Sequence, residues 1–209
     1  MKNKISSRKL NRFTTLPILL DLLRRKKLVL LNPESWEDRN DAKIILEYKK
    51  RKKIQNLFAG CFGIGDETIH HWKTYANGIS GCCIEFKEKS LLEPLKSKKN
   101  FRWGDVEYMK LETAENTKIP TDRIPFTKRW PYQCENEFRI IWEGKTDRAT
   151  IDIPIHFNSI NKITISQGIP AEVYKSIKEL LKDEIGNPEH KINRSTLFEN
   201  RRWIKAFNK

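Results

Sequence analysis

Alternating polar and apolar side chains between residues 135 and 142 form the clearest pattern in this sequence. In an extended strand, successive side chains point to opposite faces. One face would carry Phe138, Ile140 and Trp142. The other would carry Glu135, Glu137 and Arg139, with the two carboxylates about 7 Å apart, close enough to act on one ligand. The neighbouring guanidinium would favour the ionised form of both acids. An exposed strand with a cross-strand ion pair would show the same alternation.

Apolar residues at helical spacing predict four helices, and shorter apolar or alternating runs predict the strands around them. The helices are expected over residues 16–27, 42–53, 66–76 and 171–182. The strands are expected over residues 8–14, 28–31, 56–64, 81–86, 103–109, 135–142, 149–155 and 160–165. The inward positions of the last helix are Val173, Ile177, Leu180 and Leu181. Residues 112–127 have no clear period and contain two prolines, so we expect an irregular connection there.

Length and composition indicate one folded domain over residues 1–209. A chain of 209 residues is long enough to bury a sizeable core. Its hydrophobic content of 38% is low, but six Trp and ten Phe argue against a disordered chain. The mixture of strands and helices predicts the α+β class.

The balance of charge points to nucleic acid, either RNA or DNA, as a partner. Lys and Arg number 41 against 27 Asp and Glu, which gives a net charge of +14 and favours contact with polyanions. The candidate phosphate contacts are Lys49, Lys50, Arg51, Lys52, Lys53, Arg129, Arg201 and Arg202. Such contacts position a nucleic acid without recognising its sequence. Low-GC coding bias and solubility also produce lysine-rich surfaces, and a charge run is most often a solvated face.

Other sequence features exclude several classes of protein. The four cysteines have neither the CxxC spacing of a zinc site nor the density of a secreted scaffold. His70 and His71 do not form a recognised zinc pattern with Cys61 or Cys82, so no metal site is expected. No apolar run is long enough for a membrane span, and the N-terminus lacks the apolar stretch of a signal peptide. We therefore expect a cytoplasmic protein without a membrane partner.

Four motifs cover nearly the whole chain: LVLLNPESWEDRND, HHWKTYANGISGCCIEF, KRWPYQCENEFRII and INKITI. Their order resembles a bacterial family known as domain of unknown function 2971. Members of that family typically show W-S-H-Y-A, G-x-x-I-E-F and W-x-Y-E-x-E-x-R. This chain departs from the pattern at Lys73 and Thr74, where the family has Ser-His, and at Cys134, which shifts the spacing before Glu135.

The sequence also combines a basic residue in the first strand, an L-x-x-L-L helix, a Tyr-bearing helix and a strand that begins E-x-E-aromatic. This combination resembles the ADP-ribosyltransferase fold, which has a split β-sheet core flanked by helices. The resemblance implies that NAD is used, that Arg12 holds it, that Tyr75 packs on nicotinamide and that Glu137 grips the nicotinamide ribose. Glu135 would orient the acceptor nucleophile. Trp72 and Arg139 would complete the cofactor site.

These patterns lead to one principal hypothesis and two alternatives. The principal hypothesis is a mono-ADP-ribosyltransferase that modifies nucleic acid or a nucleic-acid-associated protein, as a toxin or phage-defence effector with an antitoxin or other defence-system partner. The alternatives are a non-catalytic nucleic-acid-binding module and a metal-dependent nuclease. The principal hypothesis requires Arg12, Tyr75 and Glu137 to converge on one cleft with a basic rim.

Overall fold

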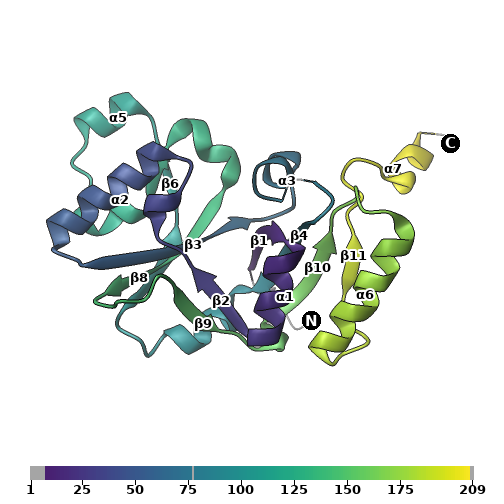
Figure 1. Cartoon of the computed structure of the whole chain (residues 1–209). Coiled ribbons are helices and arrows are strands. Elements are labelled where there is room, and N and C mark those ends of the chain that lie inside the picture. The colour runs from purple at the N-terminus through teal and green to yellow at the C-terminus, as the bar shows by residue number, and fades with distance from the viewer. Residues whose placement is uncertain (1–7, 77, 208–209) are drawn as a thin grey trace, which may run out of the picture.

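The computed structural model describes residues 8–76 and 78–207, which form an α+β fold around a seven-stranded mixed sheet (Figure 1). The helices are α1 (Leu16–Arg25), α2 (Arg39–Lys52), α3 (Ile69–Tyr75), α4 (Glu88–Leu92), α5 (Leu111–Asn116), α6 (Ala171–Ile185) and α7 (Arg201–Ala206). The strands are β1 (Lys9–Thr15), β2 (Lys27–Leu30), β3 (Asn56–Ile64), β4 (Gly81–Lys87), β5 (Phe101–Asp105), β6 (Glu107–Met109), β7 (Thr127–Arg129), β8 (Glu137–Gly144), β9 (Ile151–Pro154), β10 (Ile160–Ile165) and β11 (Ile192–Arg194). The α+β prediction is confirmed.

The seven-stranded sheet is split into two wings that meet at β1 and β3. Its strand order is β11-β10-β4-β1-β3-β8-β5. β1 pairs with β4 along its whole length, and β3 pairs with β8 from Asn56 to Gly63. The two wings are joined through the pairs Leu10–Ile64 and Asn11–Gly63, after which β1 and β3 diverge. The split sheet core flanked by helices that the sequence predicted is therefore present.

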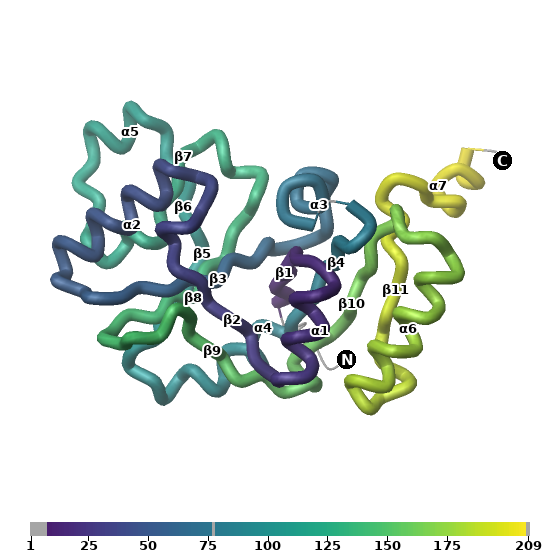
Figure 2. Tube along the Cα trace, viewed as in Figure 1, coloured from purple at the N-terminus to yellow at the C-terminus, as the bar shows by residue number. Residues whose placement is uncertain are grey.

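Three apolar clusters fill the two faces of this sheet. The largest cluster joins α1, α6 and the apolar side of β8, including Phe138 and Ile140. A second cluster packs Ile45 and Tyr48 of α2 on β3 and β8 at the opposite face. The third packs α3 on β1 and β4 through Trp72. In Figure 2, α2 and α3 lie on different wings of the same sheet, on either side of the split.

The hydrophobic pattern predicted most elements within a few residues, but several predictions were wrong. The single strand expected over residues 103–109 is divided into β5 and β6, which belong to different sheets. The connection at residues 112–127 contains α5 and a 3-10 helix, Thr121–Phe126. On α6, Val173 and Leu180 are 46% and 42% exposed, whereas Leu181 is buried. The stripe that packs is Tyr174, Ile177, Leu181 and Ile185, at spacings of three and four residues. Because α6 covers the edge of the sheet, only this narrow stripe reaches the core.

Within the described residues, the chain contains no helix with both the length and the apolar character needed to cross a membrane.

Candidate active site

A sharp turn at Asn136 places the side chains of Glu135 and Glu137 close together. The strand pattern did not predict this turn. Glu135 ends a 3-10 helix, Trp130–Glu135, and β8 begins at Glu137. Asn136 between them is left-handed, with φ of 40°. Its carbonyl accepts a hydrogen bond from the Ile64 N–H at 2.8 Å, and its side-chain amide donates to the Ile64 carbonyl at 2.9 Å. The prediction that Glu135 lies in the strand was wrong, yet both carboxylates are buried together.

Lys128 on β7 links the two carboxylates. Its Nζ lies 2.6 Å from Glu135 Oε2 and 3.7 Å from Glu137 Oε2. Asp41, in the first turn of α2, lies 3.7 Å from the same nitrogen. Lys128 is only 8% exposed, so its charge interacts with these acids at low dielectric. The carboxylates raise the pKa of Lys128 even though its burial acts in the opposite direction.

Arg139 fixes Glu137 from the other side and is fully buried. Its Nε and Nη2 donate to the two oxygens of Glu137 at 2.7 and 2.9 Å. Its terminal nitrogens also donate to both oxygens of Asp41, and Nη1 donates to the Pro125 carbonyl. These bonds use all five N–H groups of a guanidinium. Trp36 covers the group, with its ring centroid 4.9 Å from the guanidinium carbon.

Glu137 is ionised in this surrounding. Burial would raise its pKa, but the charges of Arg139 and Lys128 outweigh that effect and the pKa is lowered. The expectation that Arg139 favours the ionised carboxylate therefore holds for Glu137. The backbone N–H of Glu137 donates to the Tyr108 hydroxyl at 2.8 Å, which fixes the start of β8.

Tyr75 closes the site from α3. Its hydroxyl donates to Glu135 Oε1 at 2.6 Å, although the residue is 43% exposed. The helix is held by His71, whose ring stacks on Phe13 and whose Nε2 lies 2.8 Å from the Glu135 carbonyl oxygen. Gly63 permits this approach, because a Cβ there would lie 3.1 Å from that Nε2 atom. Tyr75 is thus a partly exposed ring set over a buried carboxylate.

Arg12 lies at the split between the wings. Its Nη1 donates to the Cys61 carbonyl at 2.8 Å, beyond the last registered pair of β1 and β3. The neighbouring Asn11 is aligned with Gly63, and Gly63 is aligned with Glu137. Two strand spacings, or about 10 Å, therefore separate the backbones near Arg12 and Glu137. Arg12 and Glu137, which are distant in sequence, thus lie on strands that are separated by β3.

Two predicted cofactor contacts occupy positions that offer a ligand little surface. Arg139 has no exposed surface and all its donors are engaged. Trp72 is 4% exposed, packs in the cluster with Phe13, and donates its indole N–H to Glu67. Both residues hold other parts of the site in place: Arg139 binds Glu137, and Trp72 packs on Phe13.

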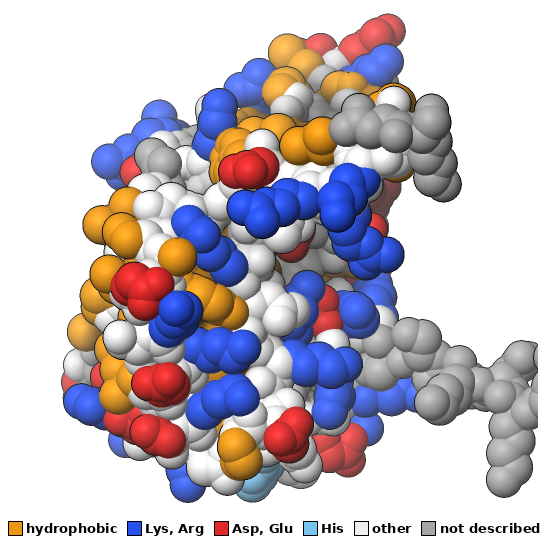
Figure 3. Space-filling view, turned by 90° about the vertical axis from the view of Figure 1, so that its right-hand side faces the viewer, with side chains coloured by type: hydrophobic (Ala, Val, Ile, Leu, Met, Phe, Trp, Pro, Cys, Tyr) orange, Lys and Arg blue, Asp and Glu red, His pale blue; other side chains and the backbone are white. Residues whose placement is uncertain are grey.

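The predicted basic contacts do not form one patch. Three members of the run at the end of α2 have acidic partners: Lys49 pairs with Glu34, Arg51 with Glu47, and Lys52 with Asp122. Lys50 and Lys53 are exposed there, as is Arg129, which follows Lys128 on β7. Arg201 and Arg202 are exposed on α7, at the opposite side of the molecule from α2 in Figure 1. Lys and Arg side chains are spread over the face that carries α6 and α7 (Figure 3).

Sequence analysis missed several residues of this site. They are Asp38, Asp41, Lys128, Tyr108, His71 and Asn136. Asp38 had a usable signal, because an Asp ahead of a helix commonly caps it, and its carboxylate accepts from the N–H groups of Asn40 and Asp41. Lys128 had none, because a lysine in a basic sequence is expected to be solvated.

No protein-family model matches the sequence, and no curated protein matches it either. Membership of domain of unknown function 2971 therefore stays a prediction. Among solved structures, the chain is similar to Thermus sp. 2.9 DarT in complex with NAD+, with a TM-score of 0.44 and 11% identity over 91% of this chain and 96% of that one. It is also similar to the same protein in complex with ADP-ribosylated ssDNA, with a TM-score of 0.45 and 13% identity over 90% and 93% of the two chains. Likenesses this distant do not assign a function to the chain.

Proposed function

We propose that this protein is an ADP-ribosyltransferase that uses NAD as its donor and a nucleic acid as its acceptor. The observation that carries the proposal is the pair of buried carboxylates, Glu135 and Glu137, bridged by Lys128 beside the split where Arg12 lies. A structural ion pair needs neither two acids at one lysine nor a tyrosine that closes over one of them. Burying this many charges is costly, so the arrangement is more consistent with a site than with a stabilising device.

Glu137 would stabilise the positive charge that develops when the nicotinamide–ribose bond breaks. Its lowered pKa keeps it negative at neutral pH, and its two bonds to Arg139 hold it in place before the reaction. A fixed carboxylate beside an oxocarbenium-like centre lowers the barrier because it does not need to reorganise. Each carboxylate oxygen has a second lone pair, which can accept a hydrogen bond from a ribose hydroxyl. Arg139 is thus a positioning residue and not a cofactor contact.

Glu135 would direct the acceptor. Its two oxygens contact Tyr75 and Lys128. A nucleophile on the acceptor that displaces the Tyr75 hydroxyl would meet a carboxylate that can accept its proton as the new bond to ribose forms. Nicotinamide leaves with the electron pair of the broken bond, so the transfer needs no metal or redox partner.

Arg12 and Tyr75 would hold the donor. Apart from the bond of Nη1 to the Cys61 carbonyl, the Arg12 guanidinium has no further hydrogen bond to a described residue, so it has donors for a pyrophosphate. The exposed ring of Tyr75 is suited to packing on nicotinamide once its hydroxyl leaves Glu135. The side chains now fill the site, so donor binding requires Tyr75 to turn outward.

The experiment uses labelled NAD with single-stranded DNA, duplex DNA, RNA and cell lysate as acceptors, with and without EDTA. We expect Glu137→Gln to lower nicotinamide release by about 100-fold. Glu135→Gln should reduce transfer more than release, because water can still trap the ribose. Tyr75→Phe should retain donor affinity that Tyr75→Ala loses.

Glu143→Gln is the matched control, since Glu143 lies on the same face of β8 but pairs with Arg102. Absence of both nicotinamide release and transfer with every acceptor would sink the proposal. An equal loss in Glu143→Gln would sink the assignment of Glu137. Binding to nucleic acid that falls steeply with salt but is unaffected by these substitutions would favour the non-catalytic module. Cleavage that EDTA abolishes would favour the nuclease.

We also propose, from the sequence alone, a toxin or phage-defence role with an antitoxin or other defence partner. The same holds for a cytoplasmic location and for membership of domain of unknown function 2971. The net charge of +14 supports a polyanionic acceptor.

A further inference from the structure

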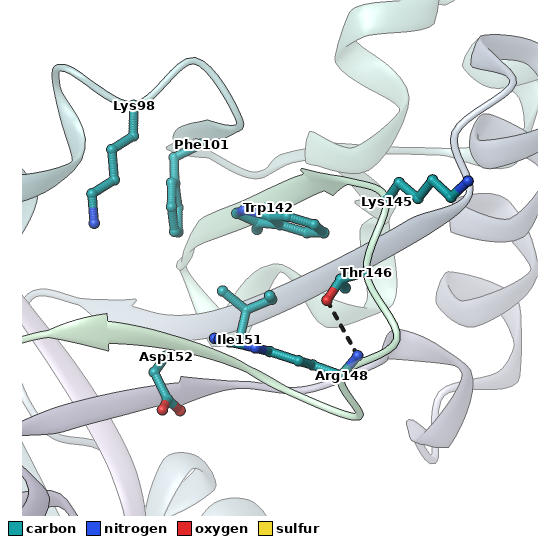
Figure 4. A pocket seen from close by; sticks show the side chains of 8 residues that line it. All are labelled: Lys98, Phe101, Trp142, Lys145, Thr146, Arg148, Ile151 and Asp152. Carbon is teal, nitrogen blue, oxygen red and sulfur yellow. Dashed lines mark hydrogen bonds between the residues drawn. The ribbon is translucent and has the colours of Figure 1, made fainter.

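A pocket of about 420 Å³ lies at the far end of β8, on the face opposite Glu137 (Figure 4). Its lining includes Lys98, Phe101, Trp142, Lys145, Arg148 and Asp152. Trp142 follows Glu137 by five residues, which along a strand is about 17 Å. The pocket is therefore separate from the candidate active site, and a ligand in one would not contact residues of the other.

The wall of the pocket is aromatic, and a glycine in the backbone makes room for its main ring. The Trp142 ring packs on Phe58 of the core, with ring centroids 5.9 Å apart, and remains only partly buried. Its ring lies against Gly144, where a Cβ would come within 2.6 Å of the indole. Phe101 is paired with Trp142 across β5 and β8 and forms the adjoining wall. Such surfaces are suited to a flat aromatic ligand.

Cations stand at the edges of this aromatic wall. Lys98 lies on one side, with Nζ 5.8 Å from the centroid of Phe101. In Figure 4, the Arg148 side chain extends beneath Trp142, whereas Lys145 points away from that ring. Lys98 and Arg148 can therefore both reach an anion attached to a ligand that rests on the indole.

The carboxylate of Asp152 is turned away from the aromatic wall. In Figure 4 it points away from Trp142, on the other side of the strand from Ile151. Its Oδ2 is paired with Arg25 and Lys27. Asp152 therefore supplies no contact to a ligand that rests on the indole.

We propose that this pocket binds a nucleotide unit, with the base on Trp142 and the phosphate at Lys98 and Arg148. An aromatic face with two cations beside it corresponds to the base and the phosphate of a nucleotide. The unit can come from a free nucleotide or from a single-stranded nucleic acid, because both present the same groups. This site goes beyond the proposed transferase function and does not depend on it.

The test measures the affinity of the full chain for AMP, adenosine, inorganic phosphate and a 5′-phosphorylated single-stranded oligonucleotide by titration calorimetry. AMP should bind more tightly than adenosine or phosphate. Trp142→Leu should weaken AMP binding about tenfold or more, in keeping with the loss of base stacking. Arg148→Ala and Lys98→Ala should each weaken AMP but not adenosine, and Gly144→Ala should act in the same direction as Trp142→Leu by displacing the ring.

Two controls keep the result specific. Lys118→Ala removes an exposed lysine outside the pocket and should leave AMP binding unchanged. Arg12→Ala and Tyr75→Ala alter only the candidate active site, so AMP binding at the pocket should persist in both. Loss of AMP binding in these two variants and not in Trp142→Leu would overturn the proposal, as would phosphate that binds as tightly as AMP. If the oligonucleotide binds more tightly than AMP in a Trp142-dependent way, nucleic acid is the source of the unit; otherwise it is the free nucleotide.

Discussion

The two ends of α2 carry opposite charges in opposite surroundings. At the N-terminal end, Asp38 caps the helix and Asp41, 2% exposed, binds both terminal nitrogens of Arg139. At the C-terminal end, residues 50–53 are exposed, and Lys49, Arg51 and Lys52 each pair with one exposed acid. The helix dipole favours both arrangements. About 15 Å of helix separates Asp41 from the middle of the basic run, so one element connects the site to the surface.

The difference teaches that position, and not the number of charges, decides what a charged residue does. The buried carboxylate of Asp41 is paired with Arg139, and removing it leaves the charge of Arg139 without compensation. The exposed lysines are screened by water and salt, and one can replace another. The basic run is the most conspicuous charged feature of the sequence, whereas the buried acids form the charged part of the candidate active site.

The largest expected effect comes from Asp41→Ala. It would leave two N–H groups of the buried Arg139 without acceptors, so we expect the free energy of unfolding to fall by about 3–5 kcal/mol. Urea unfolding followed by circular dichroism measures this. Asp122→Ala removes an exposed partner of Lys52 and serves as the control. If both substitutions lower the free energy of unfolding by the same amount, the two ends of α2 do not differ as described.

A smaller effect is expected from Lys128→Met, which keeps the length of the side chain but removes its charge. Loss of the bond to Glu135 should lower the free energy of unfolding by about 2 kcal/mol at neutral pH. The substitution also removes a charge that lowers the pKa of Glu137, so that pKa should rise. The acid limb of nicotinamide release should therefore move to higher pH.

The dependence of stability on pH checks the same prediction. Because the folded-state pKa of Glu137 is lowered, its contribution is present above the ordinary carboxyl range and is lost as the pH falls through the folded pKa. Lys128→Met should lose most stability at neutral pH, and the gap from the natural chain should narrow on acidification. A gap that stays constant down to low pH would show that Lys128 does not act through these carboxylates.

The sequence predicted the strand face of β8 but not the network beneath it. Alternation correctly placed Phe138 and Ile140 against the core, because apolar burial has a period of two in any strand. Convergence of Glu137, Asp41 and Lys128 arises from the packing of three separate elements, which local periodicity does not encode. Asn136 also escaped prediction, because the alternation placed it inside the strand, although asparagine adopts left-handed backbone more readily than most residues. The basic run suggested a free phosphate-binding surface, but three of its five side chains already pair with acids.

Asn136 provides a test of intermediate size. Asn136→Ala would place a Cβ-bearing residue without a polar side chain in left-handed backbone and would remove the bond to the Ile64 carbonyl. We expect a loss of about 1–2 kcal/mol in the free energy of unfolding. Asn136→Gly should recover part of that loss, because glycine adopts this backbone readily. Equal losses for the two variants would mean that the hydrogen bond, and not the backbone, is what matters at this turn.

The smallest effect is expected at the surface end of α2, in Glu47→Gln. Glu47 and Arg51 form an ion pair one helical turn apart at 3.0 Å, with both side chains about half exposed. Pairs of this kind contribute only a few tenths of a kcal/mol, because water screens the charges and two long side chains must be ordered. We expect a change within about 0.5 kcal/mol, which should diminish further in 1 M salt as screening shortens the range of the interaction. The same salt should leave most of the Asp41→Ala effect intact, since burial protects the Arg139 pair from ions. A salt-insensitive loss above 1 kcal/mol at Glu47 would show that this end of the helix is also held by a specific network, and the contrast between its two ends would then fail.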